Sequence, residues 1–534
     1  MSPDWDAEAD VVIVGFGGAG ACAAIEAADR GRDVLVVERF SGGGATAISG
    51  GIVYAGGGTR QQVAAGVTDT AEAMLAYLRF ETGDVVSAAT LERFCAQSVD
   101  NLRWLEENGV PFDASMAPRK TSYPTNDHYL YYSGNELARP YRDQAPPAPR
   151  GHRAHGAGMS GRTLFAALRR AVARRPVRVR YQTAASRLLT DASGRVVGVE
   201  CREIVAPFAR LAHRMLAGAN RKLNIYYRPA GRLLDRPIRR IEARHGVTRR
   251  FLARDGVILA AGGFVFNRKM LAEHAPAYKG GSSLGTIGDD GTGIRLGVQA
   301  GGVTDRLHRV SAWRFFNPPI ALVDGVLVNQ EGERVCDETL YGARIGDHIA
   351  RQTGSRAYLV VDRRVLDEAK RQLPSQTLWF QWTQMKYLFL FGHARGATID
   401  ELAGELGVAA EGLRHTIETY NEDARSGRPD AMGKDAGHVR PLETGPYYAF
   451  DCSLRTQPGF PCPVITLGGL AVCEETGAVL RADGGVVAGL YAAGRTAVGV
   501  CSESYVSGLA IADCVFSGRR AAAAIAARAD NETG

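Results

Sequence analysis

The sequence predicts an α/β fold with a parallel, Rossmann-like sheet and more than one domain, and three observations lead to that class. The chain has 534 residues, whereas a single hydrophobic core stops growing at roughly 250–300 residues. Residues 11–14 form a continuous β-branched run, typical of a strand buried on both faces of a parallel sheet. Glycines, a small-residue helix and a second strand follow this run, which is the order of a strand–helix–strand unit.

The glycines after the first strand form a G-x-G-x-x-G motif at 15–20. In such a turn Gly15 permits the tight bend, Gly17 lets the backbone approach a pyrophosphate, and Gly20 lets the helix pack on the strand. Glu38 ends the second strand, at the position where an acid binds ribose hydroxyls. These features together predict a dinucleotide site. The residues expected to form it are Gly15, Gly17, Gly18, Ala19, Gly20, Glu38 and Arg39.

A second glycine-rich loop at 41–51 follows directly after this acid. A nicotinamide enzyme has no need of such a loop, whereas in a flavoprotein it wraps the pyrophosphate and reaches the isoalloxazine edge. The loop therefore favours FAD over a nicotinamide cofactor. Its residues expected to contact FAD are Gly44, Ala45, Thr46, Ser49, Gly50 and Gly51.

Almost the whole chain resembles the fumarate reductase/3-ketosteroid dehydrogenase flavoprotein superfamily. The resemblance rests on A-A-G-G at 260–263, on G-L-Y-A-A-G at 489–494 and on the start of a last helix at 508–509. It implies that these segments line FAD and that the last helix directs its N-terminus at the flavin. Some relatives attach FAD to a His in the second glycine-rich loop, and 44–46 has none, so noncovalent FAD is expected. The further residues implied to contact FAD are Ala261, Gly262, Asp290, Gly494, Arg495, Gly508 and Leu509.

The resemblance also implies an α+β catalytic cap domain inserted into a Rossmann-like FAD-binding domain. The expected division is 1–279 for the first part of the FAD-binding domain, 280–452 for the cap, and 453–534 for the second part. A site between two domains suits a ligand that must be enclosed away from water.

A basic insertion at 203–250 interrupts the first part of the FAD-binding domain. The stretch 202–254 holds fourteen Arg and Lys against three Asp and Glu, so the net charge of +7 is concentrated there. A nucleic-acid role for the whole protein is therefore not expected. The insertion is amphipathic, and two interpretations stay open: peripheral contact with an anionic membrane surface, or packing on its own domain or another subunit.

The loop before the last helix, 500–508, helps to distinguish between the reactions that members of this superfamily carry out. It has no Arg or His and carries Glu503, so anchoring a dicarboxylate such as fumarate is unfavourable there. Its Y-x-S-G at 505–508 resembles the loop of bacterial 3-ketosteroid Δ4-(5α)-dehydrogenases. In that subgroup a tyrosine follows a G-x-R-V-x-x-E segment, which is present at 332–338, and Tyr341 occupies that place.

The resemblance implies desaturation of the A-ring of a 3-oxosteroid, an apolar small molecule. We expect the Tyr505 hydroxyl and the Gly508 N–H to polarise the C3 ketone, and Tyr341 with Ser507 as relay to take the neighbouring proton. Hydride then passes to flavin N5. The two tyrosines are interchangeable at this stage. Three alternatives also stay open: a Δ1-3-ketosteroid dehydrogenase, a flavin-dependent reductase of another enone or enoate, and a flavoprotein subunit that works through a partner.

Composition and cysteine usage are those of an ordinary globular enzyme, with 45% hydrophobic and 23% charged residues. The nine cysteines are odd in number and lack C-x-x-C spacing, which argues against zinc and a disulfide framework and favours a cytoplasmic location. No segment is long and apolar enough to predict a transmembrane helix. No haem or iron–sulfur motif is present, so an external electron acceptor of unpredicted identity is required.

Overall fold

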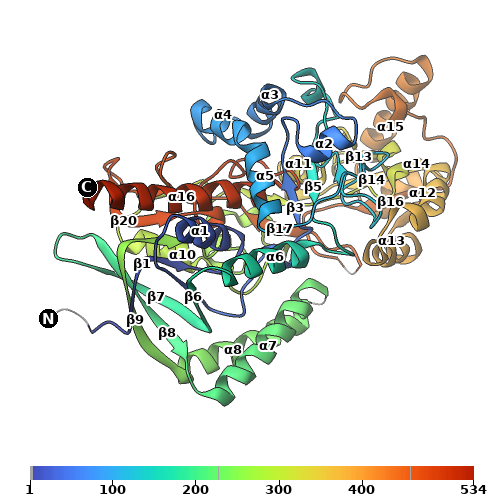
Figure 1. The fold of residues 1–534 in the computed structure, drawn as a ribbon. Coiled ribbons are helices and arrows are strands. Elements are labelled where there is room, and N and C mark those ends of the chain that lie inside the picture. Colours follow the sequence, from blue (N-terminus) through green and yellow to red (C-terminus); the bar gives the residue numbers. More distant parts are fainter. Residues whose placement is uncertain (1–3, 227, 458, 534) are drawn as a thin grey trace.

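The computed structural model describes residues 4–226, 228–457 and 459–533, and its largest element is a sheet with a parallel centre (Figure 1). Five neighbouring strands, from β20 to β6, run parallel, and β19 is antiparallel at the edge. In sheet order these strands are β19 (Ala478–Leu480), β20 (Val486–Ala492), β9 (Gly246–Leu259), β1 (Ala7–Val14), β2 (Val34–Glu38) and β6 (Val177–Tyr181). Their carboxyl ends meet at one edge, where ligands bind in sheets of this kind.

Both faces of this sheet are covered. Helices α1 (Gly18–Asp29), α6 (Gly161–Ala173) and α16 (Leu509–Thr533) cover one face, and α1 and α16 lie side by side (Figure 1). The pair packs so closely that a Cβ on Gly518 would lie 2.5 Å from the Ala19 carbonyl oxygen. On the other face lie β7 (Thr183–Thr190), β8 (Val196–Ile204) and α10 (Thr292–Gln299).

A second sheet has its own hydrophobic core, and all of its strands come between β9 and β20 in the chain. It is therefore inserted between two strands of the large sheet, and the predicted α/β class with an inserted α+β unit is confirmed. Its strands, in sheet order, are β13 (Val326–Val328), β14 (Tyr358–Val361), β16 (Tyr447–Asp451) and β15 (Ala394–Gly396). Its helices are α11 (Gly342–Ala350), α12 (Arg363–Gln376), α13 (Trp379–Phe391), α14 (Ile399–Leu406) and α15 (Ala410–Ser426).

Smaller elements join the two cores. Strand β17 pairs with both β10 and β12, and β18 pairs with β11, so chain from both sides of the insertion meets in these short sheets. The strands are β3 (Ile52–Tyr54), β4 (Leu130–Tyr131), β5 (Gly151–Arg153), β10 (Ser282–Ser283), β11 (Thr304–Asp305), β12 (Val310–Ala312), β17 (Pro463–Thr466) and β18 (Gly469–Leu470). The helices are α2 (Arg60–Ala64), α3 (Ala71–Thr82), α4 (Ala88–Ala96), α5 (Ser98–Glu107) and α9 (Arg268–His274).

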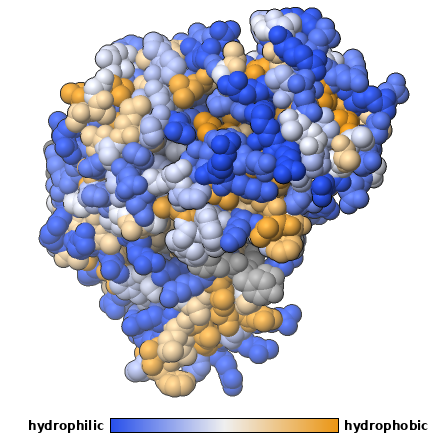
Figure 2. Space-filling view, turned by 90° about the vertical axis from the view of Figure 1, so that its right-hand side faces the viewer, coloured by the Kyte–Doolittle hydropathy of each residue, from blue (hydrophilic) through white to orange (hydrophobic). Residues whose placement is uncertain are grey.

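The basic insertion folds as a pair of helices, α7 (Pro207–Tyr226) and α8 (Arg228–His245), at the lower end of the molecule (Figures 1 and 2). The expected bounds of 203–250 were too wide, because β8 continues to Ile204 and β9 begins at Gly246, where the two residues pair. The two helices pack on residues of the large sheet's part of the chain, among them Arg39 and Phe40.

The described chain contains no helix with the length and apolar character needed to cross a bilayer. All nine cysteines are free thiols.

Candidate active site

A cavity of about 1480 Å³ opens where the parallel strands end and continues between the two cores. Pockets for small molecules are usually about 300–1,000 Å³, so this one has room for a dinucleotide and a second ligand. Two residues expected to contact the cofactor, Gly20 and Leu509, do not line it. Those that do are Gly15, Gly17, Gly18, Ala19, Glu38, Arg39, Gly44, Ala45, Thr46, Ser49, Gly50, Gly51, Ala261, Gly262, Asp290, Gly494, Arg495 and Gly508.

The three motif glycines have different surroundings. Gly15 has φ +104°, in the region that favours glycine. A Cβ on Gly20 would lie 2.0 Å from the Gly15 carbonyl oxygen, so Gly20 lets α1 approach the turn. A Cβ on Gly17 would meet nothing within 4 Å, and Gly17 faces the cavity. The space left at Gly17 fits a bound group, whereas Gly15 and Gly20 shape the backbone around it.

The first turn of α1 is open to an anion. Its N-cap residue is Gly17, which has no side chain to cap the helix, and the Gly18 N–H donates to Thr46 Oγ1 at 3.1 Å. Thr46 belongs to the second glycine-rich loop, so this contact brings the two loops together at the helix N-terminus. Free N–H groups and the helix dipole make such an end favourable for phosphates.

Two acids beside the cavity, one at the end of β2 and one before α10, hold protein groups around it. The buried Glu38 carboxylate accepts the Phe16 N–H and the Phe40 N–H, each at 2.8 Å, and burial raises its pKa. Asp290 accepts from the Arg39 guanidinium at 2.9 Å. The other Arg39 donors bind Glu242, so Arg39 lines the cavity already engaged by two carboxylates.

Arg495 supplies a test of whether the cavity suits a cofactor. Its guanidinium is buried and pairs through Nη2 with Asp289, which raises the Arg495 pKa although burial alone would lower it. Its Nη1 is buried without a hydrogen-bond partner among the described residues. An unpartnered buried donor is costly, so this wall favours a ligand that brings an acceptor to Arg495. With the space at Gly17 and the open turn of α1, the lining fits a dinucleotide.

The other part of the cavity contains the residues predicted to be catalytic. Tyr341, Tyr505, Ser507 and Gly508 all line it. Gly508 has φ +95°, and a Cβ there would lie 2.7 Å from the Tyr54 nitrogen, so only glycine fits before α16. Among the described residues, neither the Tyr505 hydroxyl nor the Gly508 N–H has a hydrogen-bond partner, which leaves two donors for a ligand.

Aromatic rings form the walls around these hydroxyls. Trp313 stacks on Tyr505 with ring centroids 5.2 Å apart, and Phe315 packs against Tyr341 at 5.4 Å. Both Trp313 and Phe315 line the cavity. This part therefore presents apolar surface with a few hydroxyl groups, which suits an apolar ligand with a polar end.

Comparison with known proteins agrees with this geometry. Residues 10–506 match the family model described as "FAD binding domain". The chain belongs to this FAD-binding family. FAD is therefore its cofactor, as the two glycine-rich loops predicted; noncovalent attachment stays a prediction.

Three relatives show how this flavoprotein is related within the family. It is 39% identical to a 3-oxo-5-alpha-steroid 4-dehydrogenase of Comamonas testosteroni, over 92% of this chain and 93% of the relative. It is 27% identical to a fumarate reductase (cytochrome) of Shewanella frigidimarina, over 96% of this chain and 76% of the relative. A crystal structure of a 3-ketosteroid-Δ4-(5α)-dehydrogenase from Rhodococcus jostii RHA1, in complex with 4-androstene-3,17-dione, superposes with TM-score 0.81 and 32% identity and covers 98% of each chain.

The hydroxyl groups of the flavoprotein form a chain around Ser507. Tyr131 O–H donates to Ser507 Oγ at 3.2 Å. Burial raises the pKa of Tyr341 well above its ordinary value, and the hydrogen bond with Ser507 acts against that rise. Burial also raises the pKa of Tyr505 and of Tyr131. Of the two predicted tyrosines, only Tyr341 is therefore joined to a donor that stabilises its anion.

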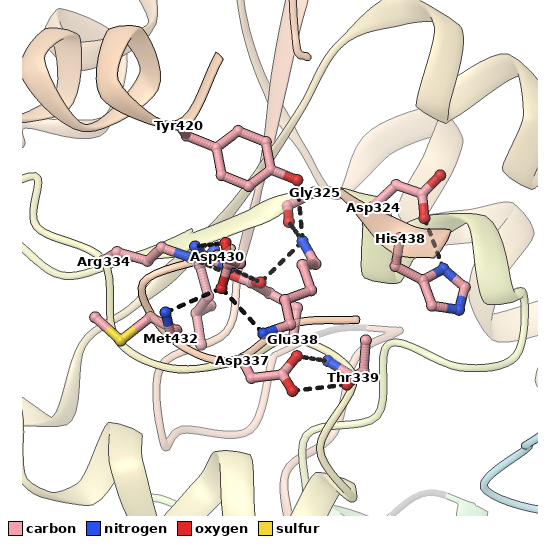
Figure 3. A network of polar contacts seen from close by, with 12 residues as sticks. Asp324, Gly325, Arg334, Asp337, Glu338, Thr339, Tyr420, Asp430, Met432 and His438 are labelled. Carbon is pink, nitrogen blue, oxygen red and sulfur yellow. Dashed lines mark hydrogen bonds and ion pairs between the residues drawn. The ribbon is translucent and has the colours of Figure 1, made fainter. Parts of the chain in front are cut away.

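The segment that carries Tyr341 is fixed by a buried charge network (Figure 3). Glu338 accepts from Arg334 at 2.8 Å and from Lys434 at 2.9 Å, and Arg334 also pairs with Asp430. Arg334 and Glu338 are the R and E of the G-x-R-V-x-x-E segment. The spacing in this segment therefore places two side chains that form an ion pair. Beyond it, the Tyr341 N–H donates to an Asn135 side-chain oxygen at 2.7 Å.

Glu503 is not the free charge at the site that the sequence had suggested. Its carboxylate pairs with Arg306 and Arg309, which neutralise it, and it does not line the cavity. Glu503 therefore does not repel an anionic substrate, and only the aromatic lining beside Tyr505 favours an apolar ligand.

Some lining residues were not predicted from the sequence. Trp313 and Phe315 were missed, although their alternation after β12 is typical of side chains that share one face of an extended segment. Tyr131, which donates to Ser507, was also not predicted. Glu242, on the basic insertion, was missed because nothing in the sequence predicts that α8 reaches Arg39.

Proposed function

We propose that this flavoprotein desaturates the A-ring of a 3-oxosteroid, with Δ4-(5α)-dehydrogenation as its main reaction. The observation that carries the proposal is the chain of hydroxyls Tyr131, Ser507 and Tyr341, beside the free Tyr505 hydroxyl in an aromatic pocket. The similarity to a 3-oxo-5-alpha-steroid 4-dehydrogenase and to an androstenedione-bound dehydrogenase supports the same substrate class.

In the proposed reaction, the chain binds the ketone and removes a proton. Tyr505 O–H and Gly508 N–H donate to the C3 oxygen and stabilise the developing enolate. Tyr341 accepts the proton from the neighbouring carbon, and Ser507, itself held by Tyr131, donates to the Tyr341 oxygen while it is charged. FAD, when bound, supplies the acceptor for the hydride. Since Ser507 lowers the pKa of Tyr341 and has no such effect on Tyr505, we assign Tyr341 as the base.

We further propose that the enclosing domains have the bounds 1–279, 280–452 and 453–534. Tyr341 comes from the second sheet's part of the chain and Tyr505 from the loop before α16, so the proposed site needs both. Enclosure between them removes water from the ketone and strengthens each hydrogen bond to it.

The test is anaerobic bleaching of the bound flavin by a panel of 3-oxosteroids, with fumarate and NADH as controls. The proposal expects a saturated 5α-3-oxosteroid to bleach the flavin rapidly. Bleaching only by 4-en-3-ones favours a Δ1-dehydrogenase. No bleaching by any steroid, together with reoxidation of reduced enzyme by an enone or enoate, favours a reductase. If the isolated protein is neither reduced by a steroid nor reoxidised by an enone or enoate, a flavoprotein subunit that works through a partner is favoured.

We also propose a cytoplasmic enzyme that contacts an anionic membrane surface through the outer face of α7. Phe208, Leu211 and Met215 are 84%, 52% and 66% exposed, and Arg210 and Arg214 lie among them. Exposed apolar and basic side chains together favour contact with such a membrane surface.

Sedimentation with phosphatidylcholine vesicles, with and without phosphatidylserine, tests this contact. The wild-type protein should bind the anionic vesicles, and the Phe208→Ser variant should not. Equal recovery of both proteins in the supernatant contradicts the contact.

A further inference from the structure

The inner side of the α7–α8 hairpin faces the cavity, and the reaction proposed above makes no use of it. Residues of both helices line the cavity, among them Asn224 on α7 and Arg239 and Glu242 on α8. The hairpin departs from β8 and returns to β9 at two paired residues, Ile204 and Gly246. A short turn suffices to join these strands, so the helices are additional to what the sheet requires.

The wall formed by the hairpin belongs to the part of the cavity near Glu38. Arg39 follows Glu38 directly and binds the hairpin, and both Glu38 and Arg39 line the cavity. In Rossmann sites the acid that ends the second strand binds the adenosine ribose. The catalytic hydroxyls contact a different set of residues, Trp313 and Phe315. The hairpin therefore faces the place of the adenosine half of FAD.

Glu242 is the main link between the hairpin and this wall. Its two carboxylate oxygens accept Arg39 Nε and Nη2 at 2.8 and 2.9 Å, a bidentate pair, and His213 Nε2 lies 3.3 Å from Oε1. The Glu242 side chain is only 16% exposed, and although burial alone would raise its pKa, the bonds to His213 and Arg39 lower it to about 2. Glu242 is thus charged at neutral pH, when bidentate pairs of this kind are strong.

Further contacts hold the hairpin in this position. The Phe40 ring stacks on His213 with centroids 5.6 Å apart and planes 3° from parallel. Gln182, next to β6, donates to the Arg210 carbonyl at 2.8 Å. Within the hairpin, Asn220 Nδ2 on α7 donates to the Gly231 carbonyl on α8 at 2.9 Å. The two helices therefore reach the cavity as one unit.

We propose that the α7–α8 hairpin is a clamp on the adenosine half of FAD, closed by the Glu242–Arg39 ion pair. Glu242 acts as a positioning residue, because it holds Arg39 and the hairpin over the cavity, and Arg239 offers guanidinium donors from the same helix. The clamp explains why the strand connection is long and why its inner side is polar. FAD retention then depends on the hairpin, whereas proton removal from the substrate does not.

The first experiment measures FAD release from the holoenzyme, followed by the fluorescence of free flavin after dilution. Glu242→Gln removes the negative charge that holds Arg39. We expect FAD to be released about tenfold faster, which corresponds to about 1.4 kcal/mol of binding free energy. Arg239→Gln should speed release about threefold, by loss of donors to the cavity. Arg240→Gln is the matched control, because Arg240 is the next residue on α8 and does not line the cavity.

A second variant separates the clamp from a purely structural role. Residues 205–245 are replaced by a short turn that joins Ile204 to Gly246. The clamp predicts an apoprotein that still unfolds in one cooperative transition but binds FAD at least about a hundredfold more weakly. Three results would overturn the proposal. Glu242→Gln could release FAD at the wild-type rate, or Arg240→Gln could release it as fast as Glu242→Gln. The variant without residues 205–245 could also bind FAD with unchanged affinity. Each readout is FAD binding, so a wrong steroid assignment leaves these results interpretable.

Discussion

The two parts of the cavity are built in different ways. Around the cofactor, the wall consists of backbone, glycines and paired charges, such as Gly17 at the turn and Arg495 against Asp289. Around the proposed substrate, it consists of aromatic rings and hydroxyls, such as Trp313 on Tyr505. The difference separates binding from chemistry: changes in the first part should release FAD, and changes in the second should stop turnover with FAD still bound.

The largest effect is expected for Tyr341→Phe, which removes the proposed base and leaves the ring in place. Loss of a general base typically costs about 10²–10⁴-fold in rate, so flavin reduction by a 3-oxosteroid should slow by that much at unchanged FAD content. Stopped-flow absorbance measures the rate. A variant that loses FAD in proportion to activity would assign Tyr341 to the cofactor part instead.

The pH dependence sharpens the assignment of Tyr341. Burial raises its pKa well above the ordinary value of about 10, so its deprotonated fraction increases with pH throughout the neutral and alkaline range. Flavin reduction by wild type should therefore accelerate from pH 7 to about pH 9.5 without a plateau, and Tyr341→Phe should lose that dependence. A plateau near neutral pH would mean that another group is the base.

Tyr505→Phe should have the next largest effect, because it removes one of two donors to the ketone oxygen. Loss of one such donor costs about 10²–10³-fold, and here the Gly508 N–H remains. The expected signature is a lower rate of flavin reduction with the same pH profile as wild type. A changed pH profile would show that Tyr505 and Tyr341 have exchanged roles.

Ser507→Ala should act through Tyr341 and have a smaller effect. Without the Ser507 donor the pKa of Tyr341 rises further, so the rate at neutral pH should fall by about tenfold, the effect of one hydrogen bond to a charged group. Raising the pH should recover part of the loss. A loss independent of pH would contradict the relay.

The cofactor part yields the smallest effects and a matched pair of variants. Gly17→Ala places a methyl group in open space beside the cavity, so the apoprotein should keep its stability while FAD binds about tenfold more weakly. Gly20→Ala places the same group 2.0 Å from the Gly15 oxygen and should destabilise the apoprotein by about 1–3 kcal/mol. Thermal unfolding and FAD titration distinguish the two, and equal behaviour would show that Gly17 is a structural glycine as well.

The same comparison explains what the sequence could predict. A backbone-built site leaves its pattern in consecutive residues, so the turn at Gly15 and the acid Glu38 were found without a structure. Tyr505 and Tyr341 were found through a resemblance to a family. Trp313 and the Glu242–Arg39 pair were missed, because each residue meets its partner only through the packing of distant segments. Glu242 also lies in a stretch rich in Arg and Lys, so its single negative charge gave no signal in the sequence.

The most direct measurement of the central claim is the position of the double bond formed in one anaerobic turnover. Enzyme with oxidised flavin is mixed with a saturated 5α-3-oxosteroid, and the product is identified by mass spectrometry and NMR. A Δ4-(5α)-dehydrogenase should bleach its flavin and form one equivalent of the 4-en-3-one. Formation of a 1-en-3-one, or bleaching only when a 4-en-3-one is supplied, would contradict that assignment.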